Sequence, residues 1–142
     1  MRKVLMLLSF MSASLFGYSD TLDYYNVYLN DSLIGEYNSF SGKPSIVLKQ
    51  SELQSGDVLT VRYGTDHPCI DCVYVLNVVV DVKEKTPGAE TTENFGKLSI
   101  LIRDLVDFRK KYEIDKFHFT HHARLKDSQH DNRIYLFELR IV

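Results

Sequence analysis

The chain has 142 residues and a formal net charge of −2, with 9 tyrosines, 8 phenylalanines and no tryptophan. This length suits one globular domain whose core is large enough to fold without obligatory disulfides. The mild acidity and the lack of a Lys/Arg cluster argue against a nucleic-acid partner.

The N-terminal segment has the features of a secretory signal peptide. A basic start is followed by the short apolar run 4–16 and by small residues up to Ser19. The run is shorter than the roughly 20 apolar residues that a membrane-spanning helix needs. We therefore predict a signal peptide over 1–19, with cleavage after Ser14 as the alternative, and a single domain over 20–142. The mature protein is expected in the periplasm or outside the cell, with no membrane span.

The mature chain begins with the pattern of a β-hairpin. Apolar and polar residues alternate along YYNVYLN, 24–30, and turn residues around Asp31 precede LIGEY, which returns as the partner strand. The polar segment 83–94, with Pro-Gly in its middle, is predicted to be a mobile loop. The other predicted strands are 45–49, 58–63, 73–82, 116–122 and 133–142. The last of them is so apolar that an exposed edge would favour aggregation, so we expect it inside a sheet.

The hydrophobic period changes from two to 3.6 residues near the middle of the second half. From Leu98 to Tyr112, leucines and aromatic residues recur at spacings of three and four, with charged residues between them. This pattern predicts an amphipathic helix over about 100–112, with Ser99 as its N-cap. In the alternative, a strand ends at Ile102 and the helix is shorter.

One helix and about seven strands, separated by frequent turn signals, predict a mainly β fold. We expect a two-sheet antiparallel β-sandwich with the amphipathic helix across one end or edge. The strand 73–82 is apolar on both faces, which indicates a central strand that is covered on each side.

The two cysteines, Cys69 and Cys72, lie in the C-x-x-C pattern of GTDHPCIDC. Export implies an oxidising compartment, in which paired cysteines tend to form a disulfide. A turn between two strands can place the Cα atoms within the roughly 4.4–6.8 Å that the bond requires. We therefore predict a disulfide that stabilises the shape of this loop.

Two other roles of the cysteine pair remain open. A zinc or copper site would use His67, Cys69 and Cys72 with His118 brought over by the fold, because thiolate and imidazole suit these metals. Thiol–disulfide exchange is the third role. It is opposed by the strand-like sequence after the pair and by Asp71, whose negative charge raises a thiol pKa.

No sequence motif indicates catalysis. There is no glycine-rich phosphate loop, no G-x-S-x-G and no H-E-x-x-H, so we expect neither an enzyme nor a cofactor. The leading hypothesis is a binding or interaction module for a protein or a surface polymer. Its predicted binding patch is a group of aromatic residues near the first hairpin: Tyr24, Tyr28, Tyr37 and Phe40.

Overall fold

The computed structural model describes residues 22–125 and 132–142. The predicted signal peptide over 1–19 lies outside the described residues. Within them the chain forms nine strands, where the sequence predicts about seven, together with one α-helix and a short 3-10 helix. The elements are β1 (Asp23–Leu29), β2 (Ser32–Asn38), β3 (Ser45–Leu48), η1 (Gln50–Glu52), β4 (Val58–Thr65), β5 (Cys72–Val79), β6 (Gly88–Thr91), β7 (Lys97–Leu101), α2 (Ile102–Tyr112), β8 (Lys116–Leu125) and β9 (Ile134–Ile141).

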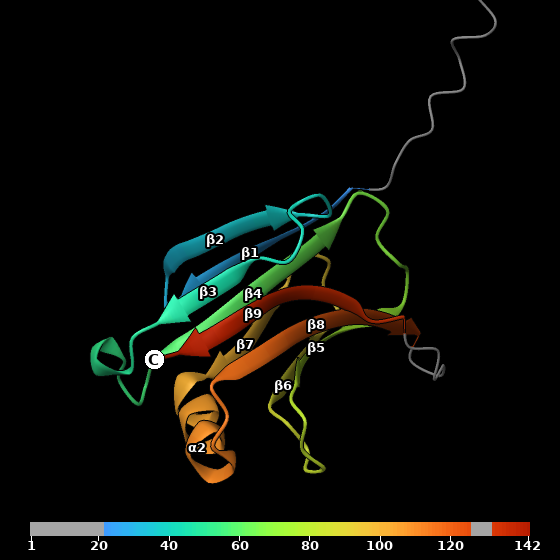
Figure 1. Cartoon of the computed structure of the whole chain (residues 1–142). Helices are drawn as coiled ribbons and strands as arrows, with labels where there is room; N and C mark the ends of the chain where they lie inside the picture. The colour runs from blue at the N-terminus through green and yellow to red at the C-terminus, as the bar shows by residue number, and fades with distance from the viewer. Residues whose placement is uncertain (1–21, 126–131) are drawn as a thin grey trace, which may run out of the picture.

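The strands form two sheets, which confirms the predicted mainly β, two-sheet sandwich (Figure 1). The first sheet has the order β2-β1-β4-β7, and the second has the order β3-β9-β8-β5-β6. Strand β9 lies between β3 and β8, so the C-terminal strand is inside a sheet, as predicted. The pairing of β3 with β9 is parallel, whereas all other described pairs are antiparallel. The sheet is therefore not purely antiparallel.

The helix is shorter than the predicted range because a strand occupies its expected first turn. Strand β7 pairs with β4 up to Leu101, and α2 begins only at Ile102, as in the alternative interpretation. Ser99 is not the N-cap: it lies in β7, where its hydroxyl is 2.8 Å from that of Thr60. The backbone hydrogen bonds that β4 offers outweigh the local helical period.

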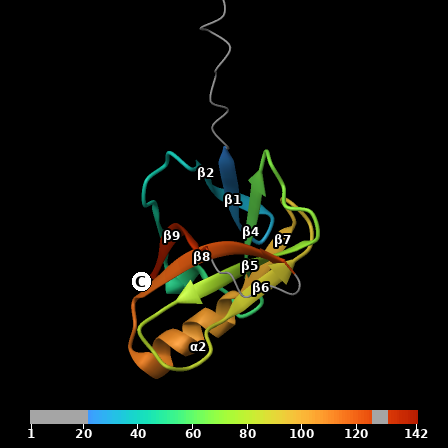
Figure 2. The same cartoon turned by 90° about the vertical axis from the view of Figure 1, so that its right-hand side faces the viewer.

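The segment predicted to be a mobile loop, 83–94, contains strand β6. Ala89 of this strand pairs with Leu76 of β5 and packs against the core. Figure 2 shows β6 beside β5, with α2 below them. Without β6, the buried strand β5 would leave its backbone groups on that side unpaired, which explains why a Pro-Gly segment still supplies an edge strand.

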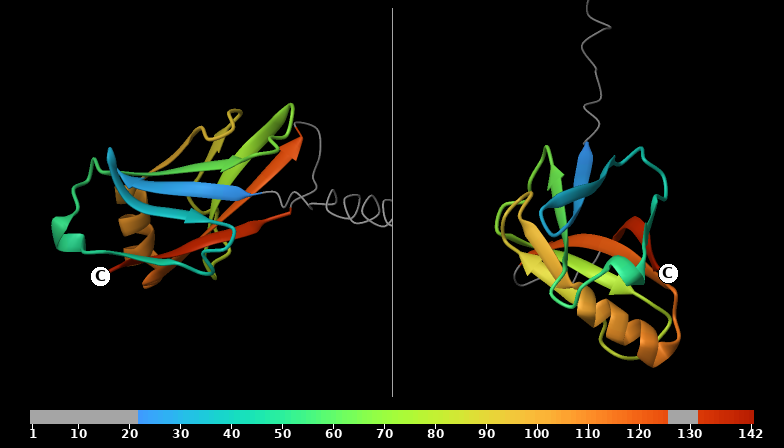
Figure 3. Two further views of the ribbon diagram at one scale, coloured as in Figure 1. Left: turned by 90° about the horizontal axis from the view of Figure 1, so that it is seen from above. Right: turned by 90° about the vertical axis from the view of Figure 1, so that its left-hand side faces the viewer.

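The core lies between the sheets and consists of the inward-facing residues of both. Phe117, Phe119 and Phe137 are fully buried. The hydroxyl of Tyr25 in the first sheet donates a hydrogen bond of 2.6 Å to the carbonyl of Leu136 in the second. Helix α2 lies on the opposite side of the molecule from β1 and β2 (Figures 1 and 3). Within the described residues, no helix is both long and apolar enough to cross a membrane.

Candidate functional site

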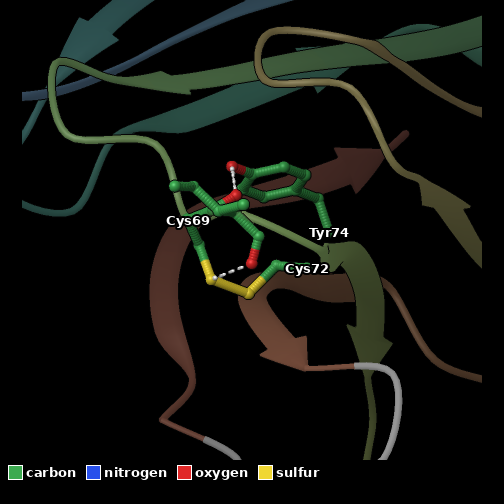
Figure 4. Close-up of a disulfide and its surroundings, with 4 residues drawn as sticks. Cys69, Cys72 and Tyr74 are labelled. Atoms are coloured by element: carbon green, nitrogen blue, oxygen red, sulfur yellow. Dashed lines mark hydrogen bonds between the residues drawn. A yellow bond between two sulfur atoms is a disulfide. The ribbon is translucent and has the colours of Figure 1, made fainter.

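The cysteine loop connects β4 to β5. The sulfur atoms of Cys69 and Cys72 lie at disulfide-bonding distance, and their Cα atoms are 5.6 Å apart (Figure 4). Cys69 is exposed in the loop, whereas Cys72 is buried as the first residue of β5. The hydroxyl of Tyr74 donates a hydrogen bond of 3.5 Å to the carbonyl of Cys69. The Cys69–Cys72 pair and the Tyr74 hydrogen bond both connect the exposed loop to the first residues of β5.

The structure does not bring together the residues of the alternative metal site. Cys72 pairs with Leu125 at one end of β8, whereas His118 pairs with Val79 near the other end. His67 is exposed, and its Nδ1 lies 3.1 Å from a carboxylate oxygen of Asp66. Across 22–125 and 132–142, no group of three or more His, Cys, Asp or Glu side chains is arranged to hold a metal ion.

The geometry that thiol–disulfide exchange favours is also missing at the cysteines. Reactive C-x-x-C pairs gain a lowered thiol pKa from a helix N-terminus. Here Cys72 begins strand β5, and no helix starts at either cysteine. The arrangement of the loop is that of a structural link between two strands.

Replacing both cysteines, with Cys69→Ser/Cys72→Ser, is expected to lower the free energy of unfolding by less than ~3 kcal/mol, because the closed loop is short. Urea unfolding of the variant and of the protein purified without reductant measures the difference. As a control, reductant should shift the unfolding midpoint of the parent protein and leave that of the variant unchanged. A parent midpoint that does not respond to reductant would contradict the stabilising role.

The outer face of the first sheet carries a second group of candidate residues. We call outer face the side chains that point away from the core on β1, β4 and β7, together with Phe95 just before β7. The register sets Tyr24 opposite Gly64, and Asn26 opposite Arg62. It also sets Arg62 opposite Lys97. The outer face therefore combines aromatic, amide and basic side chains from strands that are far apart in the sequence.

Tyr24 and Phe95 form an aromatic pair on this face. Their ring centroids are 5.3 Å apart, and Tyr24 is 37% exposed. The Tyr24 ring lies over Gly64, where a Cβ atom would come within 2.6 Å of the ring. Phe95 precedes β7 with φ 59°, and its N–H donates a 2.8 Å hydrogen bond to the carbonyl of Tyr63. The glycine and this hydrogen bond position the two rings.

Two hollows lie next to each other on the outer face. The larger one, the aromatic hollow, has a volume of about 670 Å³. The smaller one, the basic hollow, has a volume of about 270 Å³. The amide of Asn26 in the first donates a hydrogen bond of 3.4 Å to the hydroxyl of Tyr28 in the second. The aromatic hollow is lined by Leu22, Tyr24, Asn26, Glu36, Tyr37, Asn38 and Phe95. The basic hollow is lined by Tyr28, Asn30, Asp31, Thr60, Arg62 and Lys97.

The predicted aromatic patch is divided by the fold. Tyr24 and Tyr28 line the hollows of the outer face. Tyr37 borders the aromatic hollow, but its ring contacts the buried Tyr25 with centroids 5.3 Å apart. Phe40 lies in the loop after β2 and is 78% exposed, outside the lining of either hollow.

The sequence interpretation missed three residues of the outer face. The alternation along β4 turns Arg62 away from the core, opposite to its buried neighbour Val61, but it does not indicate a partner for Arg62. Phe95 and Lys97 lie between the predicted loop, 83–94, and the predicted helix over about 100–112, and the sequence assigned them to no element. Only the pairing of β4 with β7 brings them beside Arg62.

His121 is a buried titratable residue between the two sheets. It is 1% exposed, and its ring stacks on Tyr63 with centroids 3.7 Å apart. Neither ring nitrogen has a hydrogen-bond partner among the described residues. Burial, with a smaller contribution from His122, lowers the pKa of His121 to about 4. The alternation along β8 that buries Phe117 and Phe119 also buries His121. The burial of this histidine could therefore have been predicted from the sequence.

No protein-family model matches the chain, and comparisons with curated proteins and with solved structures find no match. The function therefore has to be inferred from the outer face and the cysteine loop. The loop has the arrangement of a structural link. The outer face is the part of the described surface where aromatic, basic and amide side chains meet two adjoining hollows.

Proposed function

We propose that the protein is an exported, non-enzymatic binding module that holds a protein or a surface polymer on the outer face of its first sheet. The proposal combines the signal-peptide pattern of the sequence with the arrangement of this face. The periplasm or the extracellular space would be its site of action, and the cysteine pair suits such an oxidising compartment.

The observation that carries the proposal is the aromatic pair of Tyr24, which is exposed, and Phe95, which is half-buried, beside the aromatic hollow. Aromatic side chains contribute a large contact area at binding surfaces and lose few rotamers when they bind. The close approach of Tyr24 to Gly64 limits the positions of its ring before any ligand arrives. Such preorganisation reduces the entropy lost on binding.

The linings of the two hollows support binding rather than catalysis. They contain tyrosine, asparagine, threonine, arginine, lysine and carboxylate side chains, but no serine, cysteine or histidine. A serine or cysteine activated by a histidine is a common sign of covalent catalysis, and neither lining contains these residues. The polar groups present are donors and acceptors suited to positioning a ligand.

The aromatic pair is expected to be necessary for binding. Substituting both residues, with Tyr24→Ser/Phe95→Asn, should weaken ligand binding about 10-fold or more, because aromatic residues dominate binding energy at interfaces. Asparagine is chosen at position 95 because it tolerates the positive φ of this residue. NMR titration of the ¹⁵N-labelled mature protein with neutral polysaccharides, acidic polysaccharides and unstructured peptides measures the affinity and maps the bound surface.

The matched control is Val47→Ser, which removes a 55% exposed apolar side chain from β3 in the second sheet. This variant should bind like the parent protein. Amide shifts should concentrate on β1, β4 and the start of β7. Shifts confined to α2 or to the cysteine loop would contradict the proposed face, as would full binding by the doubly substituted protein.

A further inference from the structure

Arg62 and Lys97 lie side by side on the outer face, and no carboxylate among residues 22–125 and 132–142 forms an ion pair with them. The antiparallel pairing of β4 with β7 sets them directly opposite one another. Like charges in this position repel each other and destabilise a sheet. Among the described residues, neither side chain forms an ion pair with a carboxylate. A pair of residues that breaks a local rule without an internal compensation is typical of a functional site.

The surroundings of the two cations provide further hydrogen-bonding groups. The basic hollow also contains the side chains of Tyr28 and Thr60, both of which carry a hydroxyl. Asp31 is the one carboxylate in the lining of this hollow, and it forms no described ion pair with either cation. Arginine presents a planar fork that binds a carboxylate through two parallel hydrogen bonds. The hollow thus has the chemistry of a site for an anionic group.

The aromatic hollow directly adjoins the two cations. The guanidinium carbon of Arg62 lies 5.7 Å from the ring centroid of Phe95, whose other neighbour is Tyr24. A ligand that spans both hollows must offer an anionic group to Arg62 and Lys97 and an apolar surface to the two rings. The C–H faces of sugar rings provide such a surface for contact with aromatic side chains.

An extended peptide is less suited to this position. Peptides that bind β-sheets commonly add a strand to a free edge and use its backbone hydrogen bonds. Strands β1 and β4, which carry most of the outer face, each have a paired strand on both sides. A ligand on this face therefore binds to side chains, because β1 and β4 offer it no unpaired backbone edge.

We propose that the outer face binds an acidic polysaccharide, with Arg62 and Lys97 contacting its carboxylate groups and Tyr24 and Phe95 packing against its sugar rings. This inference rests on the proposed binding function and specifies the class of ligand. The net charge of the chain is −2, so attraction for the polymer arises from the local pair and not from the overall field. The affinity should therefore fall as salt screens this pair.

The test compares charged and neutral forms of one polymer. The ¹⁵N-labelled mature protein is titrated with polygalacturonate, with alginate, and with fully methyl-esterified polygalacturonate, in which the carboxylate charge is removed. We expect saturable amide shifts around Tyr24, Arg62 and Lys97 with both acidic polymers. The affinity for the esterified polymer should be lower by about 10-fold or more, because this polymer cannot form charge-assisted hydrogen bonds.

Substitution of the cations gives a second readout. The variant Arg62→Gln/Lys97→Gln should lose about 10-fold or more in affinity for polygalacturonate and most of the salt dependence. The matched control, Lys110→Gln/Lys116→Gln, removes the same charge from exposed positions on α2 and β8. It should bind like the parent protein. The amide spectra of both variants show directly whether each is folded.

Three results would overturn the inference. Absence of binding to both polygalacturonate and alginate would reject an acidic polysaccharide. Equal affinity for the esterified polymer at the outer face would reject the role of the carboxylates while leaving the proposed binding function intact. Equal binding of poly-glutamate at the same residues would identify an acidic peptide as the ligand class. By contrast, the proposed function itself fails if no polymer or peptide shifts the amides of the outer face.

Discussion

Substituting Phe137 with alanine is expected to lower the free energy of unfolding by about 3–5 kcal/mol, the usual cost of removing a buried phenylalanine ring. Phe137 is fully buried on β9, and its ring stacks on Phe119 with centroids 4.6 Å apart. It also lies 6.3 Å from the ring of Tyr25 in the first sheet. The substitution would thus open a cavity between the two sheets. Urea unfolding monitored by circular dichroism measures the loss.

The matched control for this prediction is Ile134→Ala on the same strand. Ile134 is exposed, so truncating it should change the free energy of unfolding by less than about 1 kcal/mol. A Phe137→Ala protein that unfolds at the parent midpoint would mean that this ring does not pack between the sheets. It would therefore argue against the core described above.

Acid is expected to destabilise the protein through His121. Burial lowers the pKa of this residue to about 4 in the folded protein, from its ordinary value of 6.5. Below pH 6.5 the unfolded chain takes up a proton that the folded chain does not bind until about pH 4. The contribution of His121 to stability is therefore complete above pH 6.5 and is lost progressively as the pH falls towards 4. The full effect is on the order of 3 kcal/mol.

The variant His121→Phe isolates this contribution from that of the carboxylates. Phenylalanine keeps a ring between Tyr63 and Tyr74, which are the ring neighbours of His121, but it cannot take up a proton. His122, which makes the smaller contribution to the lowered pKa of His121, is unchanged in the variant. Unfolding midpoints measured every half unit between pH 7 and 4 should diverge, with the parent protein losing more stability than the variant. Parallel curves would show that His121 does not stay neutral in the folded state.

The period of two in the sequence predicts much of the sandwich correctly. The alternation along 24–30 is seen in β1, where Tyr25 and Val27 are buried, and the same period buries Phe117 and Phe119 on β8. Such a period depends only on the alternation of side chains along a strand, which a single strand already determines. The apolar C-terminal strand was likewise expected inside a sheet, since an exposed edge of that composition favours aggregation.

The boundaries that the sequence predicted wrongly are those at which a neighbouring strand competes with local preference. Residues 97–101 have a helical period but pair with β4. Gly88 begins a strand in a polar segment because one side of β5 would otherwise be unpaired. In both cases, backbone hydrogen bonds to a partner strand outweigh weak local propensities. The partner strand lies elsewhere in the sequence, so a short stretch of consecutive residues does not reveal it.

The sequence by itself determined the alternation that buries one face of strands such as β1 and β8, where the helix lies to within a turn, and that the cysteine pair lies where a loop meets an apolar strand. Only the tertiary structure decided the candidate binding face. Arg62 and Lys97 become neighbours through the β4–β7 register, and Tyr24 meets Phe95 above Gly64. The physical reason is that burial follows a local period along each strand, whereas a surface site depends on long-range pairing that sets distant residues side by side.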